Sequence, residues 1–260
     1  MCAWNIGVVV ESFQLGARHG VEKAAELGAD GIQLHCTSGD MEPGRMTTEK
    51  RLEFADFVRD QGLTITALGG DFGKGLLDAE TNEWVVPRTR EVVDLAVDLG
   101  TRVVTTHVGY LPEDEYSEQW RAGVRAVREV ADYAAARGVV FAGETGYEAP
   151  EVLHRFLERV GSPGFKINYD PANLVIKGFD HLGGVDVLGE HIVHTHAKDA
   201  VRHDDGSFTE MRLGEGAVDF SQYLEKLRRV GFKGFLAIER EVSDRPIEDV
   251  AAAVEFLRQF

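Results

Sequence analysis

The sequence predicts a (β/α)8 barrel, in which eight parallel strands alternate with helices and close into a ring. Three observations support this fold class. The chain has 260 residues, the usual length of one barrel of this type. A glycine recurs where helix-like segments pass into strand-like ones, and several of those strands carry acidic or imidazole residues at their carboxyl ends. We therefore expect a single domain over residues 1–260, with an open doubly wound sheet as the alternative.

The recurring glycine marks each passage from a helix to the next strand. Glycine adopts the left-handed backbone conformation that ends a helix at little steric cost. A strand-like apolar run follows each time, and alternation of helices with such runs indicates a parallel sheet with helical crossovers. After an opening strand at residues 5–10, seven junctions follow: ELGADGIQL, DQGLTITAL, DLGTRVVTT, ARGVVFAGE, GSPGFKIN, VLGEHIVHT and RVGFKGFLAI. Eight strands favour closure into a barrel, and no G-x-G-x-x-G follows the first strand to support a dinucleotide-binding sheet.

Composition and charge limit the classes of partner. Lys and Arg number 28 against 44 Asp and Glu, which gives a net charge of -16 and a pI near 5.0. Such a charge repels nucleic acid and anionic membranes, and no apolar run approaches the roughly 20 residues of a membrane span. Two cysteines, Cys2 and Cys36, fit a reducing compartment, and the first ten residues look like a strand, not a signal peptide. We expect a cytoplasmic protein with a small-molecule substrate, two unpaired thiols, and no nucleic-acid or membrane partner.

Four side chains that can bind metal stand near the ends of four apolar runs. Glu144 follows VVFAG, Asp170 ends FKINYD, His196 ends HIVHTH and Glu239 follows FLAI. The first three are evenly spaced at about the length of a strand plus its crossover helix, so successive strands can bring them to one rim. One such acid would equally be a helix N-cap or an ion-pair partner. Four such residues at the ends of strands in strand-plus-helix units predict a site for one divalent metal ion. Mn²⁺ is the expected metal, and Mg²⁺, Co²⁺ and Zn²⁺ are also compatible.

The alternation of side chains within the strands supports this interpretation. Successive strand residues point to opposite faces. In the run 165–170 the apolar side chains share one face, which leaves Asp170 on the other. His194 shares the face of His196 one layer deeper, and Gln33 lies on the expected inward face of the second strand. We expect neither to bind the metal: Gln33 should support a metal ligand, and His194 should either do the same or pack in the core.

Five motifs resemble the xylose-isomerase-like superfamily of TIM barrels: GET at Glu144, NYDPAN at 168–173, HTHAKD at 194–199, LGEGAVDF at 213–220 and IERE at 238–241. That superfamily includes ketose 3-epimerases, inosose dehydratases and isomerases, and endonuclease-IV-type enzymes. The resemblance extends over essentially the whole chain. It implies one divalent cation bound by Glu144, Asp170, His196 and Glu239, with the two glutamates as the proton-transferring pair. It also implies a sugar or cyclitol substrate, and it is compatible with a homo-oligomer.

Four further residues are candidates for substrate binding. His107 ends the run VVTTH, at the expected rim of the barrel. A lone histidine at the end of a strand is more often a hydrogen-bonded structural residue, but this position favours contact with the substrate. Asn173 stands where the epimerases and endonucleases usually carry a histidine, and its amide can bind a hydroxyl. Lys198 is expected to pair with either a substrate oxygen or Asp199. Arg212 precedes a Gly-x-Gly turn, where it would bind a hydroxyl, carboxylate or phosphate, or else lie in solvent.

These residues predict a metal-dependent epimerase or isomerase of a ketose, keto-polyol or inosose. A metal stabilises the ene-diolate that forms when a proton beside the carbonyl is removed, and Glu144 and Glu239 are the expected pair of bases. A lyase of the inosose-dehydratase type would use the same ene-diolate to expel water. An endonuclease-type phosphodiesterase is disfavoured by the negative charge and by Asn173, and a barrel without turnover is disfavoured by the complete metal-binding set.

Overall fold

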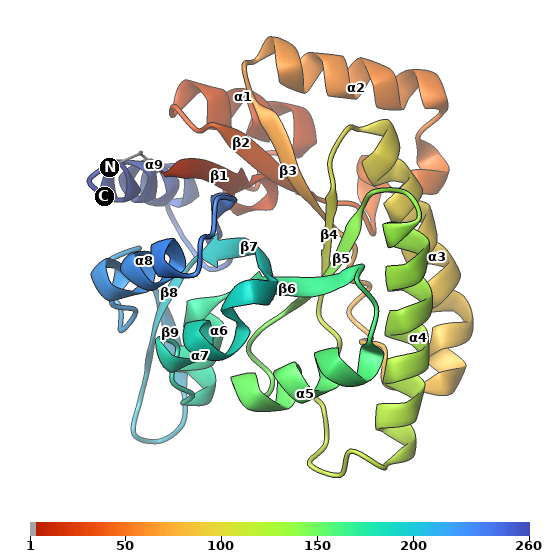
Figure 1. Ribbon diagram of the computed structural model, residues 1–260. Helices are drawn as coiled ribbons and strands as arrows, with labels where there is room; N and C mark the ends of the chain where they lie inside the picture. The colour runs from red at the N-terminus through yellow and green to blue at the C-terminus, as the bar shows by residue number, and fades with distance from the viewer. Residues whose placement is uncertain (1–3) are drawn as a thin grey trace.

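The computed structural model describes residues 4–260 as a closed barrel of eight parallel strands (Figure 1). Around the ring the strands follow the order β1-β10-β7-β6-β5-β4-β3-β2. The barrel strands are β1 Asn5–Val9, β2 Gly31–His35, β3 Thr64–Gly69, β4 Val103–Thr106, β5 Val140–Glu144, β6 Phe165–Tyr169, β7 Ile192–Ala197 and β10 Phe235–Ile238. The predicted fold class is therefore confirmed. Cys36 is a free, buried thiol as expected, whereas Cys2 lies outside the described residues.

Helices follow the strands and cover the outside of the barrel (Figure 1). They are α1 Ala17–Glu26, α2 Thr48–Asp60, α3 Ala79–Asp98, α4 Glu118–Ala135, α5 Pro150–Val160, α6 Pro171–Lys177, α7 Gly183–Leu188, α8 Phe220–Arg229 and α9 Pro246–Leu257. Short 3₁₀ helices lie in the connections: η1 Val10–Phe13, η2 Gly39–Met41, η3 Pro43–Arg45 and η4 Gly189–His191. Within residues 4–260, no helix combines the length and apolar character needed to cross a membrane.

The glycine junctions form as the sequence predicts, with one exception. Six of the seven carry a glycine with positive φ after a helix: Gly28, Gly62, Gly100, Gly138, Gly161 and Gly231. Gly189 differs, because its φ is -50° and it leads into η4. A Cβ on Gly189 would lie 2.5 Å from Val230 Cγ1. Close packing against the end of α8, and not a left-handed turn, therefore requires glycine at this junction.

The outward faces of the strands form the core between the barrel and its helices. Phe165 and Tyr169 of β6 are fully buried. Phe165 packs edge to face on Phe156 of α5, with ring centroids 6.0 Å apart, and Tyr169 stacks on Tyr223 of α8 at 5.8 Å. Burial of one such aromatic side chain contributes about 1.5–3 kcal/mol. This packing fixes which face of β6 points outward, so the alternate residues of the strand point into the barrel.

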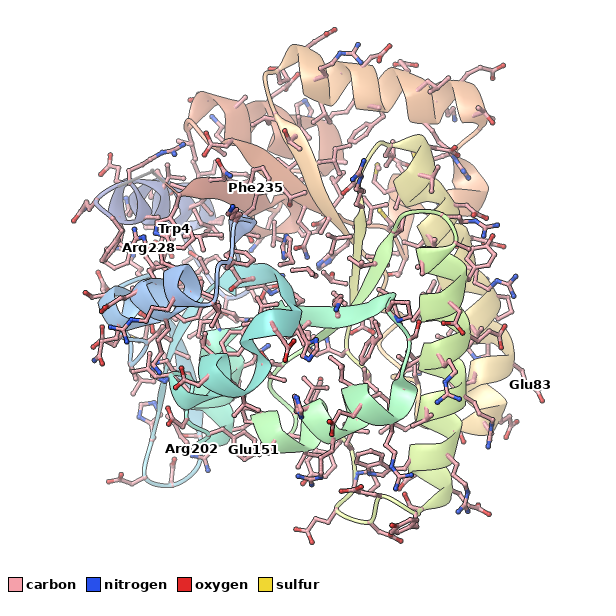
Figure 2. All side chains as sticks on the ribbon, in the orientation of Figure 1. Trp4, Glu83, Glu151, Arg202, Arg228 and Phe235 are labelled. Carbon is pink, nitrogen blue, oxygen red and sulfur yellow. The ribbon has the colours of Figure 1, made fainter. Side chains whose placement is uncertain are left out.

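Trp4, directly before β1, helps to close the ring. Its ring lies 6.4 Å from that of Phe232, which precedes β10, and the Arg228 guanidinium of α8 lies 4.7 Å over it. Figure 2 labels Trp4 and Arg228 at this contact. Arg258 also donates from Nη1 to the Trp4 carbonyl at 3.3 Å. The last two helices thus hold the first strand beside the last one.

The chain after β7 folds into a β-hairpin, which the glycine junctions and apolar runs of the sequence do not predict. The hairpin consists of β8 Asp199–Arg202 and β9 Phe208–Met211, paired antiparallel. The Asp199 carboxylate accepts the backbone N–H groups of Gly214 and Gly216, each at 2.9 Å. These bonds hold the chain that returns from the hairpin against its start, beside the carboxyl end of β7.

Candidate metal centre and active site

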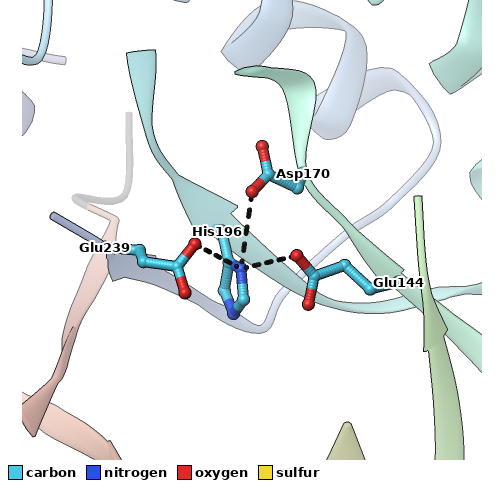
Figure 3. A group of neighbouring side chains, drawn as sticks. All are labelled: Glu144, Asp170, His196 and Glu239. Atoms are coloured by element: carbon cyan, nitrogen blue, oxygen red, sulfur yellow. Dashed lines mark ion pairs between the residues drawn. The ribbon is translucent and has the colours of Figure 1, made fainter. Parts of the chain in front are cut away.

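The four candidate metal ligands lie together at the carboxyl ends of four strands that are neighbours in the ring (Figure 3). Glu144 ends β5, Asp170 follows β6, His196 lies in β7 and Glu239 follows β10. One ligand atom from each lies within 4.8 Å of all the others. His196 Nδ1 is 3.3 Å from Glu239 Oε2, 3.4 Å from Glu144 Oε1 and 3.6 Å from Asp170 Oδ2. The barrel thus brings residues that are distant along the chain into one cluster.

Two buried atoms in this cluster have no protein partner. Asp170 is 0% and His196 2% exposed, and neither Asp170 Oδ2 nor His196 Nδ1 has a hydrogen-bond partner within residues 4–260. A buried polar atom without a partner costs about 1–3 kcal/mol. His196 Nδ1 faces the carboxylates of Glu144 and Glu239, and Asp170 Oδ2 in turn faces His196 Nδ1 (Figure 3). A divalent cation would satisfy all four side chains, and a carboxylate-rich set with one imidazole fits a cation of that kind.

His196 is oriented by groups behind it. Its Nε2 lies 3.2 Å from Gln33 Oε1, so an N–H at Nε2 can donate to that oxygen, while Nδ1 faces the carboxylates. Asn168 Nδ2 also lies 3.2 Å from Nε2. His194 sits below, with Nδ1 3.0 Å from Asn168 Oδ1 and Nε2 3.3 Å from Thr66 Oγ1. Burial lowers the pKa of His194 to about 3, so this ring is neutral and lies outside the cluster.

The two glutamates have different neighbours. Glu144 accepts Nδ2–H of Asn173 at 2.9 Å on Oε1 and Nδ2–H of Asn168 at 3.1 Å on Oε2. Glu239 instead accepts Nζ–H of Lys198 at 3.0 Å. The hydrogen bonds to Glu144 therefore come from neutral amides, whereas the hydrogen bond to Glu239 comes from an ammonium group. The two glutamates are not equivalent, so they can differ in how readily they take up and release a proton.

Opposing effects act on the pKa values in the cluster. Burial raises the pKa of Glu144, but His107 and His196 lower it by more, so that it lies well below its usual range. Burial likewise raises the pKa of Glu239, yet His196 and Lys198 bring it down to about 2. Burial lowers the pKa of His196, while Glu239 and Glu144 raise it well above the usual range. Both glutamates are thus ionised at neutral pH, and the cluster favours positive charge at its centre.

His107 lies directly after β4, on the same rim, between two carboxylates. Its Nδ1 is 2.8 Å from Asp71 Oδ2 and its Nε2 is 3.4 Å from Glu144 Oε1. Burial lowers the pKa of His107, but Glu144 and Asp71 raise it to about 11. The ring is therefore an imidazolium at neutral pH. It links Asp71, in the loop after β3, to one of the two clustered glutamates.

Two adjoining cavities open beside the cluster. The inner cavity, about 230 Å³, is lined by residues that include Gln33, His35, His107, Glu144, His196 and Glu239. The side cavity, about 180 Å³, is lined by residues that include His107, Tyr147, Asn173, Lys177, Lys198 and Phe208. Three of the four predicted substrate contacts, His107, Asn173 and Lys198, thus face these cavities, whereas Arg212 lines neither.

Lys198 and Arg212 have partners that the sequence analysis did not anticipate. Lys198 donates to Glu239 and Glu241, not to Asp199. Burial lowers the pKa of Lys198, but these carboxylates raise it well above its usual range, so it stays charged. Arg212 donates from Nε to Asp249 Oδ1 at 2.6 Å. That ion pair directs the Arg212 guanidinium toward α9, so the structure does not place it at the site as expected.

Two residues of the site were missed at the level of sequence. Asp71 stands in the segment LGGDFGKG just after β3, so the same strand-end rule that selects the four metal ligands would also have placed Asp71 at the rim. Asn168 stands two residues before Asp170 and so shares its face by strand alternation. It is fully buried and contacts Glu144, His194 and His196. A buried amide on the metal-facing side of a strand was the available signal.

The chain is similar to known proteins over nearly its whole length. It is 26% identical over 252 residues to the L-ribulose-5-phosphate 3-epimerase UlaE of Salmonella heidelberg, which covers 90% of this chain and 86% of that protein. It is 28% identical over 166 residues to the inosose dehydratase of Geobacillus thermodenitrificans, covering 55% of each. The crystal structure of a xylose isomerase domain protein from Planctomyces limnophilus matches with a TM-score of 0.87 at 28% identity, covering 99% of this chain and 97% of that one. A sequence model of xylose isomerase-like TIM barrels matches residues 21–260. The chain therefore belongs to the xylose isomerase-like TIM barrel family.

Proposed function

We propose that this protein is a divalent-metal-dependent epimerase or isomerase of a ketose, keto-polyol or inosose. The observation that carries the proposal is the placement of Glu144 and Glu239, which both line the inner cavity and flank His196 on two sides (Figure 3). Two carboxylates on different sides of a substrate can remove a proton from one face and return it to the other. Similarity to UlaE, an L-ribulose-5-phosphate 3-epimerase, supports this class of reaction.

The chemistry divides between a cation and the side chains around it. A divalent cation held by the four clustered residues would polarise a substrate carbonyl and stabilise the negative charge that develops on its oxygen. Glu144 and Glu239 are ionised, so either can accept the proton next to that carbonyl. Asn173 orients Glu144, and Lys198 orients Glu239. The His107 imidazolium lies beside Glu144 and can bind a substrate oxygen from the rim.

The proposal also covers the identity of the cation, the class of substrate and the cellular location of the protein. Mn²⁺ is our first choice because oxygen ligands with one imidazole suit it, and Mg²⁺, Co²⁺ and Zn²⁺ are the alternatives. The substrate is a small sugar or cyclitol and not a nucleic acid, because a net charge of -16 opposes binding to phosphate backbones. A cytoplasmic location is part of the proposal. All residues of the proposed site come from one chain, so the chemistry does not depend on oligomeric state. The proposal is therefore compatible with a homo-oligomer.

A lyase of the inosose-dehydratase type is the second candidate. Similarity to the Geobacillus inosose dehydratase favours it, and so does Lys198. The Lys198 ammonium lies at the rim, where Glu239 and Glu241 hold it, and it could protonate a departing hydroxyl. The reaction would start with the same proton removal and would then release water. Its unsaturated product absorbs ultraviolet light, which an epimerised sugar does not.

The decisive experiment is incubation of the protein with Mn²⁺ and a panel of keto-sugars and inososes in D₂O. After removal of the metal, NMR should show deuterium at the carbon next to the carbonyl, together with an inverted or isomerised product. An ultraviolet-absorbing product would replace the epimerase proposal with the lyase. If no member of the panel exchanges a proton with the metal-loaded protein, neither reaction is supported.

A further inference from the structure

A third cavity lies beside the inner cavity and is much larger. This outer cavity, of about 950 Å³, lies between the segments that follow β1 and β2 and the start of α2. His35, the last residue of β2, lines both cavities, and its backbone N–H donates to Glu11 Oε1 at 3.1 Å. Pockets for whole organic ligands span about 300–1,000 Å³. The inner cavity falls below that range and the outer one near its top, so a substrate of one ring leaves the outer cavity unfilled.

The charges around the outer cavity are compensated. Arg18 Nη2 lies 2.7 Å from Glu53 Oε1, and both residues line the cavity. Arg45 Nε lies 3.1 Å from Glu42 Oε2. Lys50 lines the cavity too, but so do Asp40 and Glu11. Recognition of a phosphate requires an excess of cationic donors, and these pairs leave no such excess. The walls therefore suit a ligand without net charge.

The same walls can bind hydroxyl groups and an apolar ring face. Ser38 and Asp40 offer side-chain oxygens to the cavity. The first turn of α1 also faces it, and its N-cap is Gly16, which has no side chain to bind the free N–H groups. Met41 and Met46 supply apolar surface among these polar groups. A wall that combines polar and apolar groups matches a sugar ring, with its hydroxyl edge and its C–H face.

We propose that the outer cavity binds a second, uncharged polyhydroxylated ring, joined to the keto-sugar or keto-cyclitol that reacts in the inner cavity. The substrate is then a two-ring molecule of the glycoside type. This inference rests on the proposed function of the metal centre and deepens it by naming the substrate class. His35 marks the boundary between the two rings, because it is exposed to both cavities.

Methionine methyl groups can report which ligand enters the outer cavity. Of the four methionines, Met41 and Met46 line it, whereas Met211 lies on β9 outside it. The protein, labelled with [¹³C-methyl]methionine and loaded with Mg²⁺, is titrated with fructose, with fructose 6-phosphate, and with the ketose disaccharides lactulose, isomaltulose and turanose. We expect at least one disaccharide to shift the Met41 and Met46 signals and to bind at least about tenfold more tightly than fructose.

A blocking variant and its control make the test specific. Ser38→Phe places a ring in the outer cavity and should weaken binding of that disaccharide at least about tenfold while leaving fructose binding unchanged. Ser221→Phe, at an exposed position of α8 away from the three cavities, should change neither. If no disaccharide shifts Met41 and Met46, or if only fructose 6-phosphate does, the inference is wrong.

The outcome also separates this inference from the proposed function. Deuterium exchange next to a carbonyl, measured on the same panel, tests the metal centre alone. Exchange of fructose without any disaccharide shift at Met41 and Met46 would overturn the two-ring substrate and leave the epimerase proposal standing. Disaccharide binding at these methionines, with no exchange in any compound of the keto-sugar and inosose panel, would overturn the proposed reaction while the outer sugar site remained.

Discussion

Replacement of Asp170 by asparagine should remove metal binding without disturbing the fold. Asp170 Oδ1 accepts the backbone N–H of Asn173 at 2.9 Å and so caps α6, and asparagine caps a helix as well as aspartate does. Asp170 Oδ2 is the buried oxygen without a partner in the cluster. Asp170→Asn keeps the cap and removes one negative charge. Because burial raises the pKa of Asp170, we expect the cation-free variant to be at least as stable as the cation-free wild type.

The expected size of the effect follows from binding that stabilises only the folded protein. Free metal at 100 times its Kd raises the free energy of unfolding by about 2.7 kcal/mol. In a chain of about this length that corresponds to a rise in Tm of roughly 5–10 °C. Loss of a residue that merely supports a ligand costs about 10–100-fold in metal affinity, and loss of a ligand should cost at least as much. At the same metal concentration, a variant weakened about 100-fold gains only about 0.4 kcal/mol, or about 1 °C in Tm.

Thermal unfolding followed by circular dichroism, with and without Mn²⁺ after chelation and dialysis, measures this difference. Asp78→Asn is the matched control, because Asp78 caps α3 as Asp170 caps α6 but lies outside the cluster of four. Calorimetry adds a second readout: metal binding should release about one proton, because Glu239 and Glu144 raise the pKa of His196 far enough to protonate it beforehand. A wild-type rise in Tm for Asp170→Asn would refute the assignment of this ligand, and an absent rise for Asp78→Asn would show that the loss is not specific to the cluster.

Three further predictions concern other carboxylates. Glu144→Gln and Glu239→Gln should each reduce turnover at least about 10²-fold. In D₂O, one of the two variants should still exchange the substrate proton without inverting the carbon centre. If both variants bind metal and their turnover stays within a few-fold of wild type, these glutamates are not the acid-base pair. Asp71→Asn should lower the pKa of His107 below its value of about 11, since Asp71 is one of the two carboxylates that raise it; an unchanged NMR titration of His107 would contradict this. Burial raises the pKa of Glu148 from 4.5 to about 8, so the folded state holds the proton more tightly and stability falls as pH rises between those values. Glu148→Gln should therefore stabilise the protein more at pH 8 than at pH 5, by about 3 kcal/mol as an upper value, and equal gains in Tm at both pH values would count against this ionisation.

The barrel and the metal cluster were predictable because both depend on signals that repeat. A glycine after each helix is a local requirement of the backbone, and it holds at six of the seven junctions. Strand alternation is equally local, and parallel strands in a closed barrel end at one rim. Given those two facts, residues at strand ends such as Glu144 and His196 must lie near one another. No long-range contact had to be guessed to bring them together.

The partners of the charged side chains were not predictable by the same means. Lys198 pairs with Glu239 and Glu241, which follow β10, the next strand around the ring. Arg212 pairs with Asp249 on the last helix. Neither the spacing nor the alternation of residues specifies which carboxylate a long, flexible cation reaches. The hairpin after β7 was missed for a related reason, because six of the eight residues in its short strands are at least partly exposed and the strands lack the apolar pattern that marks a barrel strand.

Asp170 shows that a structural role and a metal-binding role need not be alternatives. By sequence alone, an acid in this position is either a helix N-cap or a metal ligand. The structure gives one oxygen to each role: Oδ1 caps α6, while Oδ2 faces His196 Nδ1 at 3.6 Å. The helix that starts directly after β6 needs an acceptor at its first position, and the closed barrel turns the second oxygen of that acceptor inward. Asp170→Ala should therefore lose both functions, with about 1 kcal/mol less stability than Asp170→Asn in the cation-free state. Equal unfolding free energies for the two variants would show that Oδ1 does not stabilise α6.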